Sequence, residues 1–174
     1  MLCPFCDFDN IDGVDVCLEC QADLAPFDPQ TNDVARSVAA HPIAVLCPHR
    51  PVTVLPDMLV RDVIQMMVEE RIGCVLVSNG STLSGIFTER DVLNRVGDDA
   101  RELARSVNEV MTPRPFTISR NDSIGYALQS MDLGGYRHLP VLDADGKPEG
   151  IVSVRDILRF IGVQYAQVRQ LSDR

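Results

Sequence analysis

Four cysteines near the start of the sequence are spaced as metal ligands are. Cys3 and Cys6 form one Cys-x-x-Cys pair, and Cys17 and Cys20 form a second pair after ten intervening residues. Each pair can offer two thiolates from one tight turn, and two such turns can close a tetrahedron around a single ion. The segment between the pairs supplies three turn-forming residues, Asn10, Asp12 and Gly13. In a reducing compartment this spacing indicates metal coordination and not disulfides.

The cysteine pattern resembles a zinc ribbon, and the short knuckles of rubredoxin-like iron proteins are similar to it. Both bind their metal with four cysteines, so the ligand set alone does not separate zinc from iron, and we favour zinc. A thioredoxin-like redox site needs one Cys-x-x-Cys motif in a β-α-β context, whereas this segment holds two such motifs. Four protein ligands leave no open position for a substrate. We therefore predict a structural site, whose metal contributes on the order of 10 kcal/mol to folding.

Two further residue pairs combine a hydroxyl with a carboxylate three positions later: Thr88 with Asp91, and Ser153 with Asp156. Each pair lies where an apolar run gives way to a helical pattern, so the hydroxyl can cap a helix and the aspartate can complete a capping box. The same geometry can bind an anion, because a helix N-terminus presents unpaired N–H groups and partial positive charge. The carboxylate can also accept hydrogen bonds from two ribose hydroxyls. The residues alone leave both roles open.

An internal repeat contains both of these pairs. Residues from about 46 to 96 match residues from about 110 to 161, with an offset of 64 that becomes 65 after a one-residue insertion, which we place near Asn121. The strongest match joins residues 85–93 to residues 150–158, which share Gly-Ile at the start and Arg-Asp-apolar-Leu at the end. The alignment also pairs Asp57 with Asp122 and Met66 with Met131.

Each copy predicts the same series of elements. A short strand precedes an amphipathic helix, a buried strand, a polar turn, a second strand and a helix that starts at the hydroxyl–carboxylate pair. In the first copy these elements are expected at 52–54, 58–70, 74–77, 83–87 and from 88 onward. In the second copy they are expected at 116–118, 123–133, 139–142, 149–152 and from 153 onward. The order β-α-β-β-α, given twice, predicts an α/β (α+β) fold with small sheets covered by helices.

The two copies resemble a pair of CBS motifs, also called a Bateman module, from near Val38 to near Gly162. The resemblance is carried by Gly-apolar-x-Thr/Ser-x-x-Asp in both copies and by the segments Arg71–Val77 and Arg137–Val141. It implies two tandem CBS repeats behind a small N-terminal four-cysteine ribbon. The expected divisions are a metal knuckle (1–25), a linker (26–35), a first CBS motif (36–97), a second CBS motif (98–163) and a C-terminal tail (164–174).

The resemblance also implies nucleotide-binding residues, because CBS pairs hold adenosine nucleotides in clefts between their repeats. In the first copy these are Thr53, Val54, Ile72, Gly73, Cys74, Val75, Thr88, Arg90 and Asp91. In the second copy they are Thr117, Ile118, Arg137, His138, Leu139, Pro140, Ser153, Arg155 and Asp156. We expect the second cleft to bind phosphate better, since basic side chains gather there whereas Glu69, Glu70 and Glu89 surround the first.

Charge is spread unevenly along the chain. The first 35 residues hold eight of the 25 acidic residues and none of the 16 Lys and Arg, a net charge of −8. Nucleic-acid binding needs a positive face, so the N-terminal segment argues against it. No run of the sequence approaches the roughly 20 apolar residues of a membrane span. The first residues also lack the order of a secretory signal, and we therefore expect a cytoplasmic protein.

These observations lead to two hypotheses of different classes. In the first, the chain is a regulatory module that binds an adenosine nucleotide (AMP, ADP, ATP, NAD or S-adenosylmethionine) and relays this to a partner protein. In the alternative, it is a scaffold or dimerisation protein whose acidic ribbon docks a partner. We expect no enzyme, because His41, His49 and His138 form no catalytic set with a Ser or Cys. The resemblance implies a homodimer, as do the methionines of the predicted helices, Met58, Met66, Met67 and Met131.

Overall fold

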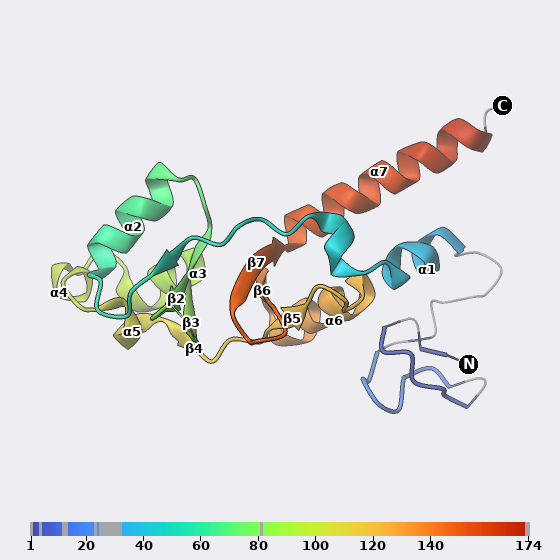
Figure 1. Ribbon diagram of the computed structural model, residues 1–174, viewed down its shortest axis with the longest axis horizontal. Helices are drawn as coiled ribbons and strands as arrows, with labels where there is room; N and C mark the ends of the chain where they lie inside the picture. The colour runs from blue at the N-terminus through green and yellow to red at the C-terminus, as the bar shows by residue number, and fades with distance from the viewer. Residues whose placement is uncertain are drawn as a thin grey trace. The chain divides into compact units, whose positions relative to one another are not determined.

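The computed structural model (Figure 1) describes residues 2–3, 5–11, 14–22, 24, 33–80 and 82–172. The chain forms two compact units, and neither unit is one contiguous stretch. The first unit comprises Met1–Pro48, Ile118–Leu139 and Val152–Arg174, and the second comprises His49–Thr117 and Pro140–Ile151. Most of the predicted linker, 26–35, lies outside the described residues. Among the described residues, no helix combines the length and the apolar character that crossing a membrane requires.

The second unit is built on the first repeat. In chain order it contains β1 (Thr53–Val54), α2 (Val60–Glu69), β2 (Cys74–Ser78), β3 (Leu83–Thr88), α3 (Glu89–Asp91), a π-helical turn (Val92–Val96), α4 (Ala100–Leu103), α5 (Val107–Val110) and β4 (Thr112–Pro113). The strand order in its sheet is β1-β2-β3-β4, with β1 and β2 parallel and the other pairs antiparallel. The β2–β3 register sets Cys74 opposite Thr88, which places the candidate hydroxyl at the end of β3.

Strand β2 is buried along its whole length, as its unbroken apolar sequence predicts. Successive strand side chains point to opposite faces, so β2 enters two clusters. Val75 and Val77 pack with residues of α2 and with Phe87 on one face, and on the other Cys74 and Leu76 pack with Ile86. Full burial of each such side chain contributes roughly 1.5–3 kcal/mol, so this strand anchors the unit and holds the end of β3 in place.

The first unit is built on the second repeat and on the N-terminal segment. Its elements are α1 (Asp33–Ala40), a 3₁₀ turn (Ile43–Leu46), β5 (Ile118–Ser119), α6 (Ile124–Gly134), β6 (His138–Leu142), β7 (Pro148–Ser153) and α7 (Val154–Ser172), and both β6 and β7 continue into the second unit. The three strands form a sheet in the order β5-β6-β7. Helix α1 packs against α6 and α7, which also contact each other. The order β-α-β-β-α is thus confirmed in both copies, and the predicted C-terminal tail continues α7 to Ser172.

Each unit also contains the segment that precedes the other repeat. In the first unit the bonds are Ile43 N to Asp122 O (2.8 Å), Ala44 N to Arg120 O (3.0 Å) and Ile124 N to His41 O (2.8 Å). In the second unit they are Val107 N to Met58 O (2.8 Å), Asn108 N to Pro56 O (3.1 Å) and Val60 N to Arg105 O (2.9 Å). Every residue of the first set is matched in the second at an offset of 64. The turn that precedes α6 or α2 therefore forms backbone hydrogen bonds with a segment that lies outside its own repeat.

These bonds correct the alignment of the two copies. The offset remains 64 beyond Asn121, because Met58 and not Asp57 is the equivalent of Asp122. It becomes 65 only between β6 and β7, where the turn 143–147 is one residue longer than the turn 79–82. The inserted residue was therefore predicted at the wrong position. An exposed turn accepts an extra residue at little cost, whereas the hydrogen-bonded start of a helix does not.

The corrected offset also changes the pairing of the methionines. Met131 matches Met67 and not Met66, and both are buried. Met58 and Met66 are half-buried and pack against the same cluster as Met67. The methionines on which the homodimer expectation rested are therefore used within the chain.

Candidate metal and nucleotide sites

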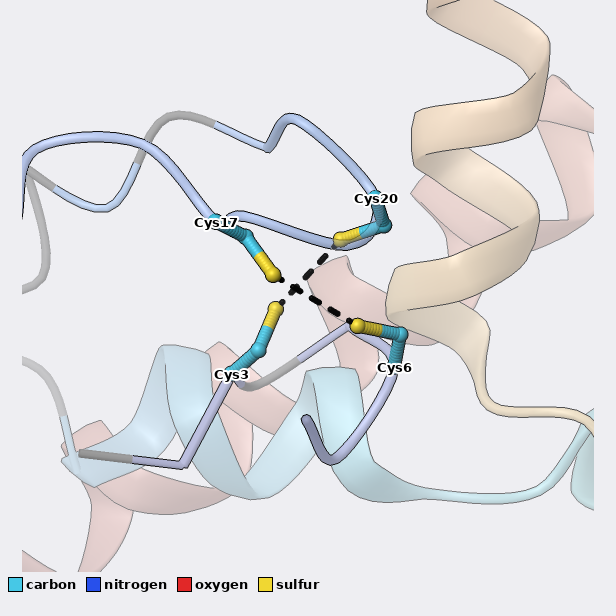
Figure 2. Close-up of side chains that lie close together, drawn as sticks. All are labelled: Cys3, Cys6, Cys17 and Cys20. Atoms are coloured by element: carbon cyan, nitrogen blue, oxygen red, sulfur yellow. Dashed lines mark hydrogen bonds between the residues drawn. The ribbon is translucent and has the colours of Figure 1, made fainter. Parts of the chain in front are cut away.

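The four N-terminal cysteines converge on one point, as their spacing predicts (Figure 2). Cys3 Sγ lies 3.5 Å from Cys20 Sγ, and Cys6 Sγ lies 3.7 Å from Cys17 Sγ. All four sulfur atoms lie within 4.8 Å of one another. Sulfur atoms bound tetrahedrally at about 2.3 Å from a zinc ion would be about 3.8 Å apart, so the set fits such an ion. Within the described part of the chain, no other group of three or more His, Cys, Asp or Glu side chains is close enough to share a metal.

The two knuckles repeat the same backbone geometry 14 residues apart. In the first knuckle, Cys3 N donates to Phe8 O at 2.8 Å and Asp7 N donates to Cys3 O at 3.0 Å. In the second, Cys17 N donates to Ala22 O at 2.8 Å and Gln21 N donates to Cys17 O at 2.9 Å. Asp7 and Gln21 close their turns with left-handed φ values of 58° and 59°. Each Cys-x-x-Cys pair is thus held in a tight turn that aims both sulfurs inward.

Asn10 supports the second knuckle directly, a role that its prediction as a turn residue missed. Its side chain is buried, and Nδ2 donates to Cys17 Sγ at 3.4 Å while Oδ1 accepts from Leu18 N at 2.9 Å. Asp12 and Gly13, predicted to share that turn, lie outside the described residues. An amide that donates to the sulfur and accepts from the next peptide fixes the orientation of a ligand.

The surroundings of the sulfurs shift their pKa values in different directions. Burial raises the pKa of Cys3 and of Cys6. Burial also opposes ionisation of Cys17, but donation from the backbone of Cys20 and from Asn10 outweighs it and lowers the pKa of Cys17 to about 6. One thiolate is therefore favoured at neutral pH, and a bound cation would favour the others, because a coordinating thiol is deprotonated.

The first hydroxyl–carboxylate pair forms a capping box at the start of α3. Asp91 Oδ2 accepts from Thr88 N at 2.9 Å and from Thr88 Oγ1 at 2.7 Å. Asp91 Oδ1 accepts from Thr112 Oγ1 at 3.1 Å and lies 3.3 Å from Arg95 Nη1. The aspartate is only 6% exposed. The carboxylate that the sequence offers to a ribose is therefore enclosed by groups of its own unit.

The second pair repeats the capping box at the start of α7. Asp156 Oδ2 accepts from Ser153 N at 2.9 Å and from Ser153 Oγ at 2.6 Å. Asp156 Oδ1 lies 3.6 Å from Arg159 Nη1, and the Arg159 side chain is 65% exposed. The position that matches Thr112 is Pro48, which has no hydroxyl to donate. The two carboxylates thus share a local motif and differ in what surrounds them.

The remaining predicted nucleotide residues differ in their access to solvent. Two hydrogen bonds connect them to the helix starts, from Glu89 N to Gly73 O and from Val154 N to Arg137 O. The exposed residues are Thr53, Arg90, Arg137 and Arg155. The half-buried residues are Ile72, Gly73, Thr88, Thr117, His138, Ser153 and Asp156. The buried residues are Val54, Cys74, Val75, Asp91, Ile118, Leu139 and Pro140.

Thr112 and Arg95 are partners of Asp91 that were not predicted from the sequence. Arg95 Nη1 also donates to Val110 O at 2.8 Å and to Met111 O at 2.6 Å, so it links the π-helical turn to the end of α5. An acidic residue followed four positions later by an arginine was a signal that could have identified Arg95. Thr112 is 21 positions away, and no local pattern indicates it.

Comparison with known families decides which repeat this is. The model of the CBS domain matches residues 44–98 and 107–163. The chain belongs to the CBS-domain family. Its two matched segments include both capping boxes, and the four-cysteine segment precedes them.

Relatives of known sequence match this chain over part of their own length. A CBS domain-containing protein of Arabidopsis thaliana, CBSCBSPB3, is 34% identical over 116 residues, which cover 66% of this chain and 19% of the relative. An uncharacterised 17.7 kDa protein of Acidianus ambivalens is 30% identical over 109 residues, which cover 62% of this chain and 65% of the relative. The matched region is therefore less than two thirds of either relative.

Solved CBS structures share the fold. The CBS domain NE2398 is 30% identical with a TM-score of 0.62, over 68% of this chain and 92% of that one. A CBS-domain protein of Pyrobaculum aerophilum complexed with AMP is 22% identical with a TM-score of 0.61, over 71% and 99% of the two chains. The CBS pair of protein MJ0100, in complex with 5-methylthioadenosine and S-adenosyl-L-methionine, is 18% identical with a TM-score of 0.65, over 72% and 98%.

Proposed function

We propose that this CBS protein is a regulatory sensor that binds an adenosine nucleotide through its CBS repeats and passes the bound state to a partner protein. The observation that carries the proposal is the pairing of a hydroxyl and a carboxylate at the first turn of α3 and again of α7. Such a turn offers N–H groups to phosphate and a carboxylate to ribose. CBS proteins of the same fold hold AMP or S-adenosylmethionine, which supports an adenosine-type ligand.

Asp156 is the better of the two ribose acceptors. A ligand at Asp91 competes with a half-buried hydroxyl donor, Thr112, and with the ion pair to Arg95. A ligand at Asp156 competes with an ion pair to Arg159, whose side chain is largely in solvent. The Asp156 side chain is 12% exposed and that of Asp91 is 8% exposed, so the two differ mainly in their partners, and we propose that ribose hydroxyls replace the contact with Arg159 more readily than the contacts of Asp91.

Charge favours the same repeat for the phosphate groups. Arg137 and Arg155 are both exposed and lie near Ser153. Arg155 follows Ser153 by two positions, and the carbonyl of Arg137 accepts a hydrogen bond from Val154 N. At the first repeat the exposed Arg90 matches Arg155, but Gly73 stands at the position of Arg137. The exposed Glu89 directly follows Thr88. A carboxylate at that position repels a polyphosphate, whereas guanidinium groups attract it and can bind it bidentately.

Calorimetric titration with AMP and with ATP tests this proposal. We expect Asp156→Asn to weaken binding about ten- to a hundredfold, because a charged acceptor to two hydroxyls is lost. The matched control is Asp91→Asn, which changes the same atom at the equivalent position and should bind almost as well as the unmodified protein. Equal affinity in all three proteins would leave both aspartates as helix caps only. A thermal-shift screen of AMP, ADP, ATP, NAD and S-adenosylmethionine that gave no shift at all would favour the scaffold alternative.

We also propose that the four cysteines bind one structural metal ion, zinc in preference to iron. The converging sulfurs, the matched knuckles and the support from Asn10 favour this role. Metal analysis of the purified protein should give close to one ion per chain, and Cys17→Ser should abolish it. If Cys17→Ser leaves the metal content unchanged, the four cysteines are not the metal ligands.

The partner surface is proposed to include a second copy of the chain. Large apolar side chains are exposed on the helices of both repeats, among them Val68 on α2, Leu133 on α6 and Leu158 on α7. Burial of such side chains against a second copy would remove apolar surface from water. Light scattering at micromolar concentration should report a homodimer, and a monomer there would contradict it.

A further inference from the structure

The four-cysteine segment bonds to helix α6 through one carbonyl from each knuckle. Ser123 Oγ donates to Phe5 O at 3.3 Å, and Gln129 Nε2 donates to Cys20 O at 2.6 Å. Phe5 lies inside the first Cys-x-x-Cys pair, and its own N–H donates to Cys3 Sγ at 3.4 Å. Both acceptor carbonyls therefore belong to the peptides that wrap the metal site.

The first repeat uses the equivalent positions differently. At the offset of 64, Gln129 matches Gln65 and Ser123 matches Leu59. Gln65 Nε2 donates to Glu69 Oε1 at 2.8 Å, within its own helix. Leu59 precedes α2 without a side-chain capping bond. The same glutamine thus stabilises its own helix in one repeat and contacts the metal-binding segment in the other.

The position of the two acceptor carbonyls depends on the metal site. Among the described residues of the segment, the buried cluster contains Cys3, Cys17, Ala22 and Leu24, and the partly buried side chains packed against it are Phe5, Cys6, Val14 and Cys20. A cluster of this size cannot fold a segment unaided, so metal binding supplies most of the folding free energy. Without the ion, Phe5 O and Cys20 O lose the geometry that accepts from α6.

The contact reaches the start of the helix as well as its middle. Ser123 is the N-cap of α6, and its Oγ also accepts from Tyr126 N at 3.1 Å. The Ser123 hydroxyl therefore donates one hydrogen bond to Phe5 O and accepts another from Tyr126 N, and the two bonds together fix its position. Ordering of the metal-binding segment therefore stabilises the first turn of α6.

We propose that a metal ion in the four-cysteine site fastens this segment to α6, so that metal loading and the stability of the second repeat are thermodynamically coupled. The proposal rests on the metal binding proposed above. It makes the metal a second ligand, besides the nucleotide, that changes the stability of the second repeat. Coupling between two sites is reciprocal: what strengthens the contact with α6 also raises the affinity for the metal. The first repeat, with Gln65 bonded inside α2, receives no such input through this contact.

Zinc affinity of the full-length protein, measured by competition with a chromophoric chelator, tests the coupling. We expect Gln129→Ala to weaken zinc binding about two- to tenfold, the effect of one hydrogen bond. Gln65→Ala removes the same side chain from the same helix position of the other repeat, and its zinc affinity should equal that of the unmodified protein. Ser123→Asp retains a capping acceptor but removes the donor to Phe5 O, and should weaken zinc binding as Gln129→Ala does.

Hydrogen exchange on the same protein provides a readout that does not depend on a variant. Removal of zinc should speed exchange in the first turn of α6 and leave the equivalent turn of α2 unchanged. Zinc binding with unchanged exchange in α6, and with equal affinity in the Gln129→Ala and Gln65→Ala proteins, would overturn the coupling and leave the metal site standing. Failure of the unmodified protein to bind zinc or iron would overturn both.

Discussion

The two repeats carry the same capping box and use it in different surroundings. In the first, Asp91 is enclosed by Thr112 and Arg95, and the helix that it begins changes to a π-helical turn and ends at Val96. In the second, Asp156 faces an exposed arginine, and its helix continues without a break to Ser172. The same capping box thus has different partners in the two copies, although both carboxylates are largely buried, with side-chain exposures of 8% and 12%.

The long helices of the two repeats differ in the same direction. Helix α2 begins at Leu59 without a side-chain cap, and its Gln65 bonds to its own Glu69. Helix α6 begins at a serine cap, and its Gln129 bonds to the carbonyl of Cys20. The glutamine of the first repeat therefore bonds within its own helix, whereas the equivalent glutamine of the second bonds to the four-cysteine segment. We expect loss of Gln129 in the second repeat to change metal binding, and loss of Gln65 in the first to leave it unchanged.

Metal removal should produce the largest effect and separate the two units. A chelator, or Cys17→Ser, should unfold the four-cysteine segment, to whose folding the metal contributes on the order of 10 kcal/mol, and should lower the midpoint of thermal unfolding of the rest of the first unit through the lost bonds to α6. The second unit contains none of the four cysteines, so its midpoint should change little. Calorimetry should resolve two transitions where the loaded protein shows one. A single unfolding transition whose midpoint falls without splitting would contradict the expectation that the two units respond differently to metal removal.

Loss of the capping carboxylates should destabilise the repeats unequally. We expect Asp91→Ala to lower the free energy of unfolding by about 2–3 kcal/mol, since a cap is lost and the bonds of the buried carboxylate to half-buried Thr112 and to Arg95 are broken. Asp156→Ala should cost about 1 kcal/mol, the usual value for a cap. Urea denaturation monitored by circular dichroism measures both. The reverse order would show that Asp156 is the more structural residue.

Cys74, the first residue of β2, should make the free energy of unfolding fall as the pH rises above 9. Burial, and then the charge of Glu89, raise the pKa of Cys74 from 9.0 to about 12. Below pH 9 the thiol is protonated in both states; between pH 9 and 12 only the unfolded state loses the proton, so stability falls by about 1.4 kcal/mol per pH unit. The stability difference between the unmodified protein and Cys74→Ala should therefore narrow by about 2 kcal/mol from pH 8 to pH 10.5. A constant difference across this range would mean that the thiol ionises freely in the folded protein.

The residues that end the two long helices should give the smallest effect. Gly135 and Arg71 occupy equivalent positions and both have left-handed φ values, 65° and 53°. Gly135→Ala introduces a side chain into this conformation and should cost about 1 kcal/mol. Arg71→Ala exchanges one side chain for another there and should change the stability by less than about 0.5 kcal/mol. Equal losses in denaturation measurements would show that the two turns are not equivalent.

Short-range patterns predicted most of the fold and much of the candidate site. The capping boxes span three residues and each knuckle spans a few, so their geometry follows from local sequence. Apolar periodicity likewise located α2, α6 and the four longer strands to within about two residues. Cys74 was predicted to be in the core, and it is buried.

The features that sequence reasoning missed connect distant positions. Ser123 meets Phe5 from 118 residues away, and Gln129 meets Cys20 from 109 residues away. No periodicity records such a pair. The insertion was predicted at the wrong position for another reason. Asp57 and Asp122 are identical residues in similar turns, and their identity suggests a pairing that the register of the following helices contradicts. Backbone hydrogen bonds determine register, whereas a matching exposed side chain does not.

The exchange of leading segments between repeats has a consequence for how the chain is made. Ile43 is fully buried, yet the carbonyl that accepts from its N–H belongs to Asp122. A ribosome adds roughly 5–20 residues per second, so roughly 4–16 seconds pass between synthesis of the two residues. During this interval neither the 3₁₀ turn of Ile43 nor the apolar face of α1 has its partner from the second repeat. The nascent chain therefore exposes these surfaces until the second repeat emerges, and cutting the chain between the repeats would leave each half without a segment that closes it.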